Sequence, residues 1–227
     1  MTEIRPSKKE IIQAEYKKMM LEAAERVLLR RGFRATTMDE IAREASFSKA
    51  TVYKYFPNKG WIIMEIILQY IDELSRCLQE IQKSTLSPEE KLKRMINSVL
   101  EIQARKENIS RLFLQDRSLH DFFHRLFADP RGSESHDYRQ ALELFKEKRE
   151  EIYRTGCQVV AEGIKSGLFK KMKPETILRY VWALVEGLLH TRYWQDERIE
   201  PKEETEQVFR FLMGGIAREP LKKGVRE

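Results

Sequence analysis

Residues 32–59 read GFRATTMDEIAREASFSKATVYKYFPNK and contain two short helix-forming segments separated by a tight turn. The run Thr37-Met-Asp-Glu40 is a capping box, in which the Thr and Glu side chains satisfy exposed backbone N–H groups, so we expect a helix from here through residue 45. Ser48 is a favourable N-cap for a second helix through residue 55, after which Pro57 breaks the chain. Two such helices joined by a short turn have the proportions of a helix-turn-helix, whose second helix fits the major groove of DNA.

The second helix of this motif carries side chains that are suited to reading DNA. The small apolar residues Ala42, Ala45 and Val52 are spaced so that the two helices can pack together. Arginines within residues 30–34, at the end of the preceding helix, add positive charge that attracts phosphate. The candidate contact residues, hydrogen-bond donors with one small apolar residue, are Ser48, Lys49, Ala50, Thr51, Tyr53 and Lys54.

Charge is distributed unevenly along the 227 residues, which carry a net formal charge of +6. Residues 1–60 hold 13 Lys or Arg against 8 Asp or Glu, whereas residues 61–227 hold 29 against 28. The excess positive charge therefore lies in the first quarter of the chain, together with the helix-turn-helix, and indicates an anionic partner at that end.

Helical periodicity extends through the rest of the chain. Apolar residues recur at spacings of three and four, no segment alternates as a strand does, and the chain has only 10 glycines and 7 prolines. We therefore expect an all-α protein, with Gly32 ending its first helix. Besides the two short helices, the expected helices span residues 7–31, 58–80, 87–102, one or two within 109–128, 138–166, 174–194 and 201–217, with a loop at 129–135.

The run from Gly32 to Lys59, and above all its segment Thr51-Val-Tyr-Lys-Tyr-Phe-Pro-Asn-Lys59, resembles the DNA-binding domain of TetR-family transcriptional regulators. The resemblance is dense from about Tyr16 to Ile67, and beyond that it is confined to the helical plan. It implies a repressor that binds a palindromic operator as a homodimer and is released by a small-molecule effector. The implied parts are a helix-turn-helix DNA-binding domain at 1–57, a ligand-binding and dimerisation domain at 58–218 and a flexible tail at 219–227.

The resemblance also implies roles for eight residues at the DNA surface. Thr37 would cap the first helix of the motif and touch a phosphate. Tyr53, Tyr55 and Lys59 would contact the DNA backbone. In a purely structural alternative, which the sequence leaves open, the two tyrosines anchor the short helices in the core and the lysines are solvated. The residues that would face the groove are Ser48, Lys49, Ala50, Thr51 and Tyr53.

Two positions depart from the family pattern. Ser46 stands in the turn where glycine is usual, and a serine with positive φ would cost roughly 1 kcal/mol. Gly60 stands in the first turn of the next helix, where a better helix former is usual, and would weaken that start by up to about 1 kcal/mol. Neither departure removes a group that would contact DNA, so both concern stability.

The second half of the chain holds aromatic, Met and aliphatic residues that are suited to an apolar cavity between helices. The expected effector is therefore hydrophobic or aromatic. For each residue taken alone, an ordinary core position is the simpler interpretation. The candidate lining residues are Met95, Val99, Phe113, Phe122, Phe127, Tyr153, Trp182 and Leu189. The candidate polar contacts are Gln103, Arg117, His120 and His190.

The last two helices have apolar faces wider than one intramolecular contact needs, and Gly187, Gly214 and Gly215 would allow a partner helix to approach closely. A single recognition helix has too small a footprint for tight specific binding, so two copies are expected on a pseudo-palindrome. We expect helices 174–194 and 201–217 to pair with their copies as a four-helix bundle. The interface residues would be Leu178, Val181, Val185, Leu188, Phe209, Leu212 and Met213.

The sequence offers little for catalysis or metal binding. His120 and His124 share a helix face at a spacing of four but lack the Glu of an HExxH site, so a solvated polar face is expected and a metal site is the alternative. Cys77 and Cys157 form no CxxC pair, and P-loop, GxGxxG and GxSxG motifs do not occur. We therefore expect no cofactor, no metal and no enzymatic activity.

The same patterns give an expected location and leave one alternative function. No apolar run approaches the roughly 20 residues of a membrane span, and the polar N-terminus lacks the apolar core of a signal peptide, so a cytoplasmic protein without membrane contact is expected. The alternative to a regulator is a helical enzyme or protein-interaction module that carries an N-terminal DNA-binding motif. Turnover of a small molecule by the purified protein would favour that alternative.

Overall fold

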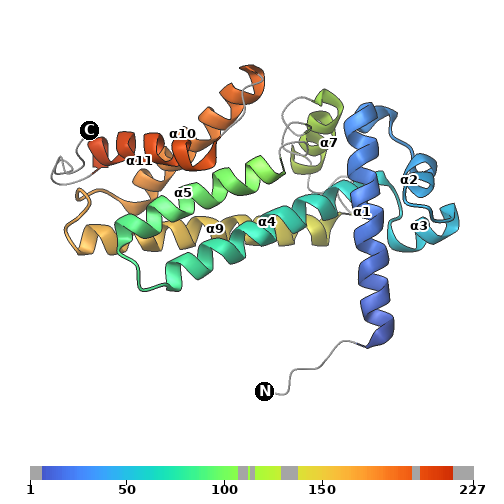
Figure 1. The fold of residues 1–227 in the computed structure, drawn as a ribbon, viewed down its shortest axis with the longest axis horizontal. Helices are drawn as coiled ribbons and strands as arrows, with labels where there is room; N and C mark the ends of the chain where they lie inside the picture. The colour runs from blue at the N-terminus through green and yellow to red at the C-terminus, as the bar shows by residue number, and fades with distance from the viewer. Residues whose placement is uncertain (1–6, 107–111, 113–115, 129–137, 196–199, 217–227) are drawn as a thin grey trace. The chain divides into compact units, whose positions relative to one another are not determined.

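The computed structural model describes residues 7–106, 112, 116–128, 138–195 and 200–216, except for the side chains of 192–195. The described residues form helices joined by short connections, so the expected all-α class is confirmed (Figure 1). The loop expected at 129–135 lies outside the described residues. The helices are α1 (Lys8–Ala35), α2 (Met38–Glu44), α3 (Lys49–Tyr55), α4 (Lys59–Lys83), α5 (Pro88–Arg105), α7 (Arg117–Ala128), α9 (Arg139–Lys165), α10 (Pro174–Gln195) and α11 (Pro201–Ile216).

The chain divides into two compact units, and each unit takes residues from two separate stretches of sequence. Unit 1 comprises Met1–Gln69 and Asn108–Leu142, and unit 2 comprises Tyr70–Glu107 and Glu143–Glu227. Helices α4 and α9 therefore begin in unit 1 and continue in unit 2. This division differs from the boundary expected after residue 57, because α7 and the start of α9 pack into the same core as the N-terminal helices.

The apolar core of unit 1 holds its short helices in place. The inward stripe of α1 includes Met20, Ala24 and Leu28, each at most 1% exposed. Ile41 of α2 and Val52 of α3 join this core and have no exposed surface. Helices of seven residues are not stable alone in water, so α2 and α3 depend on this packing, in which each large buried side chain contributes roughly 1.5–3 kcal/mol.

The expected helix ends of unit 1 are found in the structure. Gly32 interrupts α1 with φ of 74° and ψ of 168°, a conformation that glycine adopts with little strain. The capping box expected at Thr37 is confirmed, and Ser7 forms another at the start of α1: each hydroxyl accepts a hydrogen bond from the N–H of the Glu three residues later. Ser48 caps α3 in the same way, accepting from the N–H of Thr51 at 3.1 Å.

The turn between α2 and α3 keeps a left-handed backbone although it lacks glycine. Ser46 has φ of 59°, so the serine carries the strain that its Cβ imposes there. We predict that Ser46→Gly raises the free energy of unfolding by about 0.5–1 kcal/mol, measured by urea denaturation, and that Ser46→Ala does not. A Ser46→Gly variant that is less stable than the wild type would contradict this account.

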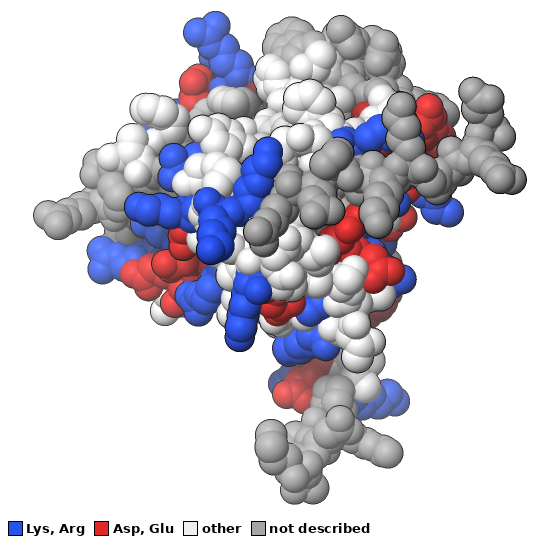
Figure 2. Space-filling view, turned by 90° about the vertical axis from the view of Figure 1, so that its left-hand side faces the viewer, with Lys and Arg blue, Asp and Glu red and all other residues white. Residues whose placement is uncertain are grey.

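Unit 2 is held by apolar packing supplemented by polar contacts. The inward face of α11, with Val208, Phe209 and Leu212, is buried, and α11 packs chiefly on α5. Lys91, whose side chain is only 8% exposed, pairs with Glu162 at 2.9 Å. Figure 2 shows Lys and Arg side chains interspersed with Asp and Glu on one face of the molecule, so the charge on that face is mixed rather than of one sign.

Candidate nucleic-acid interface

Helices α2 and α3 form the helix-turn-helix that the sequence predicts. The Phe47 N–H donates to the Ala42 carbonyl at 3.0 Å, which closes the turn. Ala42, Ala45 and Val52 are all buried, so the apolar contact expected between the two helices is present. The Phe47 ring packs against Tyr16 of α1, with the ring centroids 5.0 Å apart. The motif is therefore fixed on α1, and the opposite face of α3 is left to the solvent.

The outward face of α3 collects most of the residues expected to meet DNA. Ser48, Lys49 and Ala50 are exposed, and Tyr53 is 43% exposed, so the structural alternative of a core tyrosine does not hold for Tyr53. Thr51 is half-buried, and its hydroxyl lies 2.8 Å from the Ser48 hydroxyl, which limits the rotation of both side chains. This arrangement gives α3 a polar surface with preset side-chain positions, as direct reading of base edges requires.

Tyr55 and Thr37 lie at the margins of this face. Tyr55 is half-buried and packs against the core of unit 1. It therefore anchors α3 in the core at least in part, as in the purely structural alternative. Thr37 is exposed, and its hydroxyl donates to Glu40 at 3.0 Å and accepts from the Glu40 N–H at 3.3 Å. The hydroxyl is thus committed to its capping box, and the first turn of α2 is solvent-accessible around it.

Lys49 carries the main positive charge on the outward face of α3. Its ammonium pairs with Asp39 of α2 at 2.7 Å and lies 5.9 Å from the centre of the Tyr53 ring. The hydrogen bond and the charge of Asp39 raise the pKa of Lys49. Both partners are more than half exposed, so the pair is weak and a phosphate or a base edge can replace Asp39.

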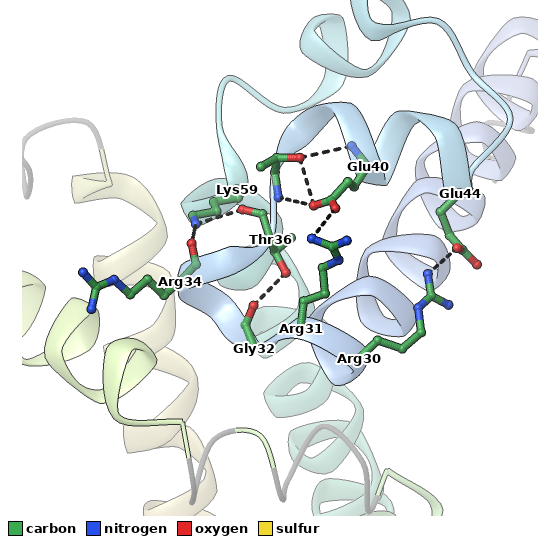
Figure 3. Close-up of polar contacts among 9 residues, drawn as sticks. Arg30, Arg31, Gly32, Arg34, Thr36, Glu40, Glu44 and Lys59 are labelled. Carbon is green, nitrogen blue, oxygen red and sulfur yellow. Dashed lines mark hydrogen bonds and ion pairs between the residues drawn. The ribbon is translucent and has the colours of Figure 1, made fainter.

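The Lys59 side chain is not positioned as the predicted contact with a DNA phosphate would require. Its ammonium donates to the carbonyl oxygens of Arg34 and Thr36 at 3.0 and 2.9 Å (Figure 3) and to that of Phe33 at 2.7 Å. It also lies 4.8 Å from the centre of the Phe33 ring. An ammonium has three protons, and these three carbonyls accept them all, so Lys59 fastens the start of α4 to the end of α1. Burial lowers the pKa of Lys59.

The arginines expected to attract phosphate are largely paired within unit 1. Arg30 donates to Glu44 of α2 at 2.5 Å, and Arg31 pairs with Glu40 at 2.8 Å (Figure 3). Arg26, one turn earlier on α1, also donates to Glu44, at 2.8 Å. These pairs tie α1 to α2 and reduce the free positive charge near the motif. The hydrogen bonds from Arg30 and Arg26 lower the pKa of Glu44 to about 2.

We predict that Glu44 titrates near pH 2 in the folded protein, against an ordinary value of 4.5. Because its pKa is lower in the folded state, its contribution to stability is fully present above pH 4.5 and is lost as the pH falls toward 2. An NMR titration of the side-chain carboxyl carbon measures the midpoint, and the Arg30→Ala variant should move it back toward 4.5. A midpoint near 4.5 in the folded wild type would show that the ion pairs do not form.

The residues expected to line one ligand pocket are divided between the two units. Phe122 and Phe127 belong to unit 1, where Phe122 is buried against Phe33 with the ring centroids 5.2 Å apart. Phe113 lies outside the described residues. In unit 2, Tyr153 is 39% exposed and its hydroxyl donates to the Glu175 carbonyl at 3.1 Å. The remaining candidates belong to unit 2 and are buried or half-buried: Met95, Val99, Trp182 and Leu189.

The residues expected at the dimer interface are mostly buried within one chain. Leu188 is half-buried, and the side chains that the chain covers itself are Leu178, Val181, Val185, Phe209, Leu212 and Met213. The outward faces of α10 and α11 instead expose Tyr180, at 64%, and Phe211, at 74%. A Cβ added at Gly187, Gly214 or Gly215 would meet no atom within 4 Å. Helical periodicity marks the apolar stripes of these two helices, but it cannot tell a stripe that packs within the chain from one that packs against a copy.

The other candidates from the sequence are scattered over the molecule. His120 and His124 are exposed, and among the residues with described side chains no three His, Cys, Asp or Glu are grouped as a metal site would need. A hollow of about 610 Å³ in unit 1 is lined by Arg31, Arg34 and Arg117, among others. No described helix is long and apolar enough to cross a membrane.

Comparison with known proteins agrees with this geometry. Residues 20–66 match the family described as bacterial regulatory proteins, tetR family. The chain is 26% identical to YhgD, an uncharacterized HTH-type transcriptional regulator of Bacillus subtilis, over 70% of this chain and 74% of YhgD. It is 25% identical to the HTH-type transcriptional repressor KstR2 of Mycobacterium tuberculosis, over 88% of this chain and 92% of the repressor.

Solved structures share the fold over most of the chain. The transcriptional regulator FadR of Bacillus subtilis, in complex with stearoyl-CoA, superposes with a TM-score of 0.68 at 18% identity and covers 88% of this chain and 98% of its own. The ketosteroid transcriptional regulator KstR2 of Mycobacterium tuberculosis superposes with a TM-score of 0.65 at 18% identity, over 89% of this chain and 95% of its own. At this level of identity the likeness shows the fold.

Proposed function

We propose that the chain is a repressor of the TetR family, whose description residues 20–66 match, and that it binds a palindromic operator as a homodimer and is released by a small hydrophobic effector. The observation that carries the proposal is the outward face of α3, where Lys49, Ala50 and Tyr53 are exposed on a helix held rigidly from behind. Such a face can enter the major groove and meet base edges.

The contacts of the proposed complex divide into two kinds. Lys49, Ala50 and Thr51 would meet base edges and so set the preferred sequence. Tyr53 would meet a phosphate, which fixes the register of the helix without reading bases. Ser48 would face the groove beside Lys49, while the Thr37 hydroxyl stays in its capping box. Tyr55 supports α3 from the core, and its exposed edge is the part that would reach the DNA backbone.

Selection of bound DNA from a random pool tests this proposal. We expect an enriched motif with two symmetric half-sites whose centres lie about one helical turn, or a small multiple of it, apart. Affinity for the enriched DNA should fall with salt, with a logarithmic slope of about −0.9 for each phosphate contact. Failure of the wild-type protein to enrich any DNA would refute the function.

Asp39 and Lys49 give opposite predicted effects on DNA binding. Asp39 is a carboxylate beside α3 that forms an ion pair with Lys49 and repels phosphates, so Asp39→Ala should tighten binding of all DNA sequences by about twofold to fivefold.

Lys49→Ala should weaken binding to the selected operator by about 1–3 kcal/mol. Fluorescence anisotropy with operator and unrelated DNA measures both. Weaker binding by Asp39→Ala would indicate that the carboxylate positions Lys49 rather than competing for it.

A homodimer fits the outward faces of α10 and α11 in unit 2. Two large exposed side chains, Tyr180 and Phe211, accompany the exposed glycines at 187, 214 and 215, whose lack of side chains would allow close helix approach. We place the interface there, in place of the buried face first expected. Two copies of α10 and α11 would then form the four-helix bundle.

The proposed effector is an apolar small molecule bound in unit 2. The supporting observations are buried Met95, Val99 and Leu189 together with half-buried Trp182. The names of two proteins of similar fold, one complexed with stearoyl-CoA and one a ketosteroid regulator, support apolar ligands as first probes.

The operator should change the affinity for the effector by the same factor by which the effector changes the affinity for the operator. An apolar probe that binds unit 2 without changing operator affinity would contradict release by that probe.

A further inference from the structure

Two glycines of the N-terminal helices lie where side chains from a distant stretch of sequence fill the space. A Cβ added at Gly60 would lie 2.2 Å from the Tyr138 hydroxyl oxygen and 2.9 Å from Cζ of Phe122. A Cβ added at Gly32, which has φ of 74°, would lie 2.9 Å from Oδ2 of Asp116. The unusual glycine at position 60 therefore has a steric reason, since it leaves room for Tyr138 within unit 1.

The Tyr138 hydroxyl links the starts of two helices. It donates to Oδ1 of Asn58 at 2.6 Å, and the same oxygen accepts from the Trp61 N–H at 3.1 Å, which caps α4. The Tyr138 carbonyl accepts from the Leu142 N–H at 2.9 Å at the start of α9. The rings of Tyr138 and Trp61 pack with centroids 5.2 Å apart. Both helices that continue into unit 2 therefore begin at one shared contact.

Asp116 links the end of α1 to the start of α7 in the same unit. Its Oδ2 accepts from the Phe33 N–H at 2.5 Å, directly after Gly32. Its Oδ1 accepts from the N–H groups of Ser118 and Leu119 at 2.9 and 3.1 Å, which caps α7. Burial acts to raise the pKa of Asp116, but these hydrogen bonds together with that of the Ser118 hydroxyl outweigh it and hold the pKa below its ordinary value. The carboxylate is thus charged and fully engaged near neutral pH.

We infer that Asp116 and Tyr138 are positioning residues for DNA binding, which together clamp the two ends of the segment that carries the helix-turn-helix. Asp116 fixes the backbone at Phe33, just before α2, and Tyr138 fixes Asn58, just after α3. Neither residue is near the exposed face of α3 in sequence, and both act through the ends of the motif. The inference rests on the proposed function. It makes the starts of α4 and α9, the two helices that continue into unit 2, the points at which a change in unit 2 would reach the motif.

Gly60→Ala and Tyr138→Phe, alone and combined, test the clamp. In a self-sufficient DNA-binding domain, Gly60→Ala would strengthen α4, because alanine favours helix more than glycine does. With the clamp, the new methyl group displaces Tyr138, and operator affinity should fall by about tenfold while affinity for unrelated DNA stays within twofold. Tyr138→Phe removes the hydrogen bond to Asn58 and should by itself lower operator affinity. In that background Gly60→Ala should lower the affinity by less than about a further threefold, because the contact that the methyl group would break is already lost.

Matched controls separate positioning from general loss of structure. Thr155→Val removes a hydroxyl hydrogen bond of 2.8 Å in unit 2 and should leave operator affinity unchanged. Amide hydrogen exchange of a peptide covering residues 58–64 should rise in Gly60→Ala and in Tyr138→Phe, and should rise little further in the double variant, because both changes break the same contact of Tyr138 with Asn58. Equal effects of Gly60→Ala in both backgrounds, or none, would overturn the clamp. If the wild type itself enriches no DNA, the proposed function fails. The exchange rates then still show whether the contact between Tyr138 and Asn58 holds the start of α4 in unit 1.

Discussion

Lys59→Ala is expected to lower the free energy of unfolding by about 2–4 kcal/mol. The ammonium of Lys59 donates to three carbonyl oxygens at the end of α1, at 2.7–3.0 Å, and hydrogen bonds from a charged donor are each worth about 1.5–3 kcal/mol before the loss is softened by solvent access. Those carbonyls have no following helical turn to bond with, so removing Lys59 leaves them without the donor that it supplies. Urea denaturation followed by tryptophan fluorescence measures the change.

Two variants separate this structural role from a phosphate contact. Lys54→Ala removes an exposed lysine of α3 and should change the free energy of unfolding by less than about 0.5 kcal/mol. Lys59→Arg keeps the charge, but the planar guanidinium cannot direct three donors at three converging carbonyls, so it should recover only part of the stability. Normal stability of Lys59→Ala together with weaker binding of all DNA would restore the phosphate role that the sequence predicted.

Phe211→Glu is expected to abolish dimerisation and to lower operator affinity by at least about a hundredfold, because a monomer can engage only one half-site. Phe211 is 74% exposed on α11, and a charge there would be buried without a partner between two copies. Light scattering at micromolar concentration measures the mass, and anisotropy measures operator binding.

The control is Leu144→Glu, which places the same charge on an apolar residue of α9 that is 42% exposed. It should leave both the dimer mass and operator affinity unchanged. A Phe211→Glu variant that keeps the dimer mass would move the interface away from this face of α11. If the wild type is monomeric in solution and still binds an operator with two half-sites, the two copies would assemble only on the DNA.

Local signals in the sequence predicted the helix ends of the motif. The capping box at Thr37 and the glycine stop at Gly32 are set by residues within a few positions of each other. The exposed face of α3 was predictable for the same reason, since it lies opposite buried Val52 on a helix of known spacing.

Contacts between residues distant in sequence could not be predicted in this way. Lys59 bonds carbonyls 23–26 positions earlier, and Tyr138 meets Asn58 from 80 positions away. Periodicity shows that a helix face is apolar, but not which element covers it, so Phe122 was assigned to a ligand pocket and is found in the core of unit 1. The one local sign of the long-range contact was Gly60, whose cost to the helix had no explanation within the motif.

The most direct test of the central claim is the DNA sequence preference of the wild type and of Lys49→Ala, both selected from the same random pool. Lys49 is exposed on the outward face of α3, and Lys165→Ala, at an exposed lysine of α9 in unit 2, serves as the control. We predict a symmetric wild-type motif that Lys49→Ala relaxes at one position in each half-site and that Lys165→Ala leaves unchanged. An unchanged motif for Lys49→Ala, or no motif for the wild type, would contradict the account that α3 reads the operator.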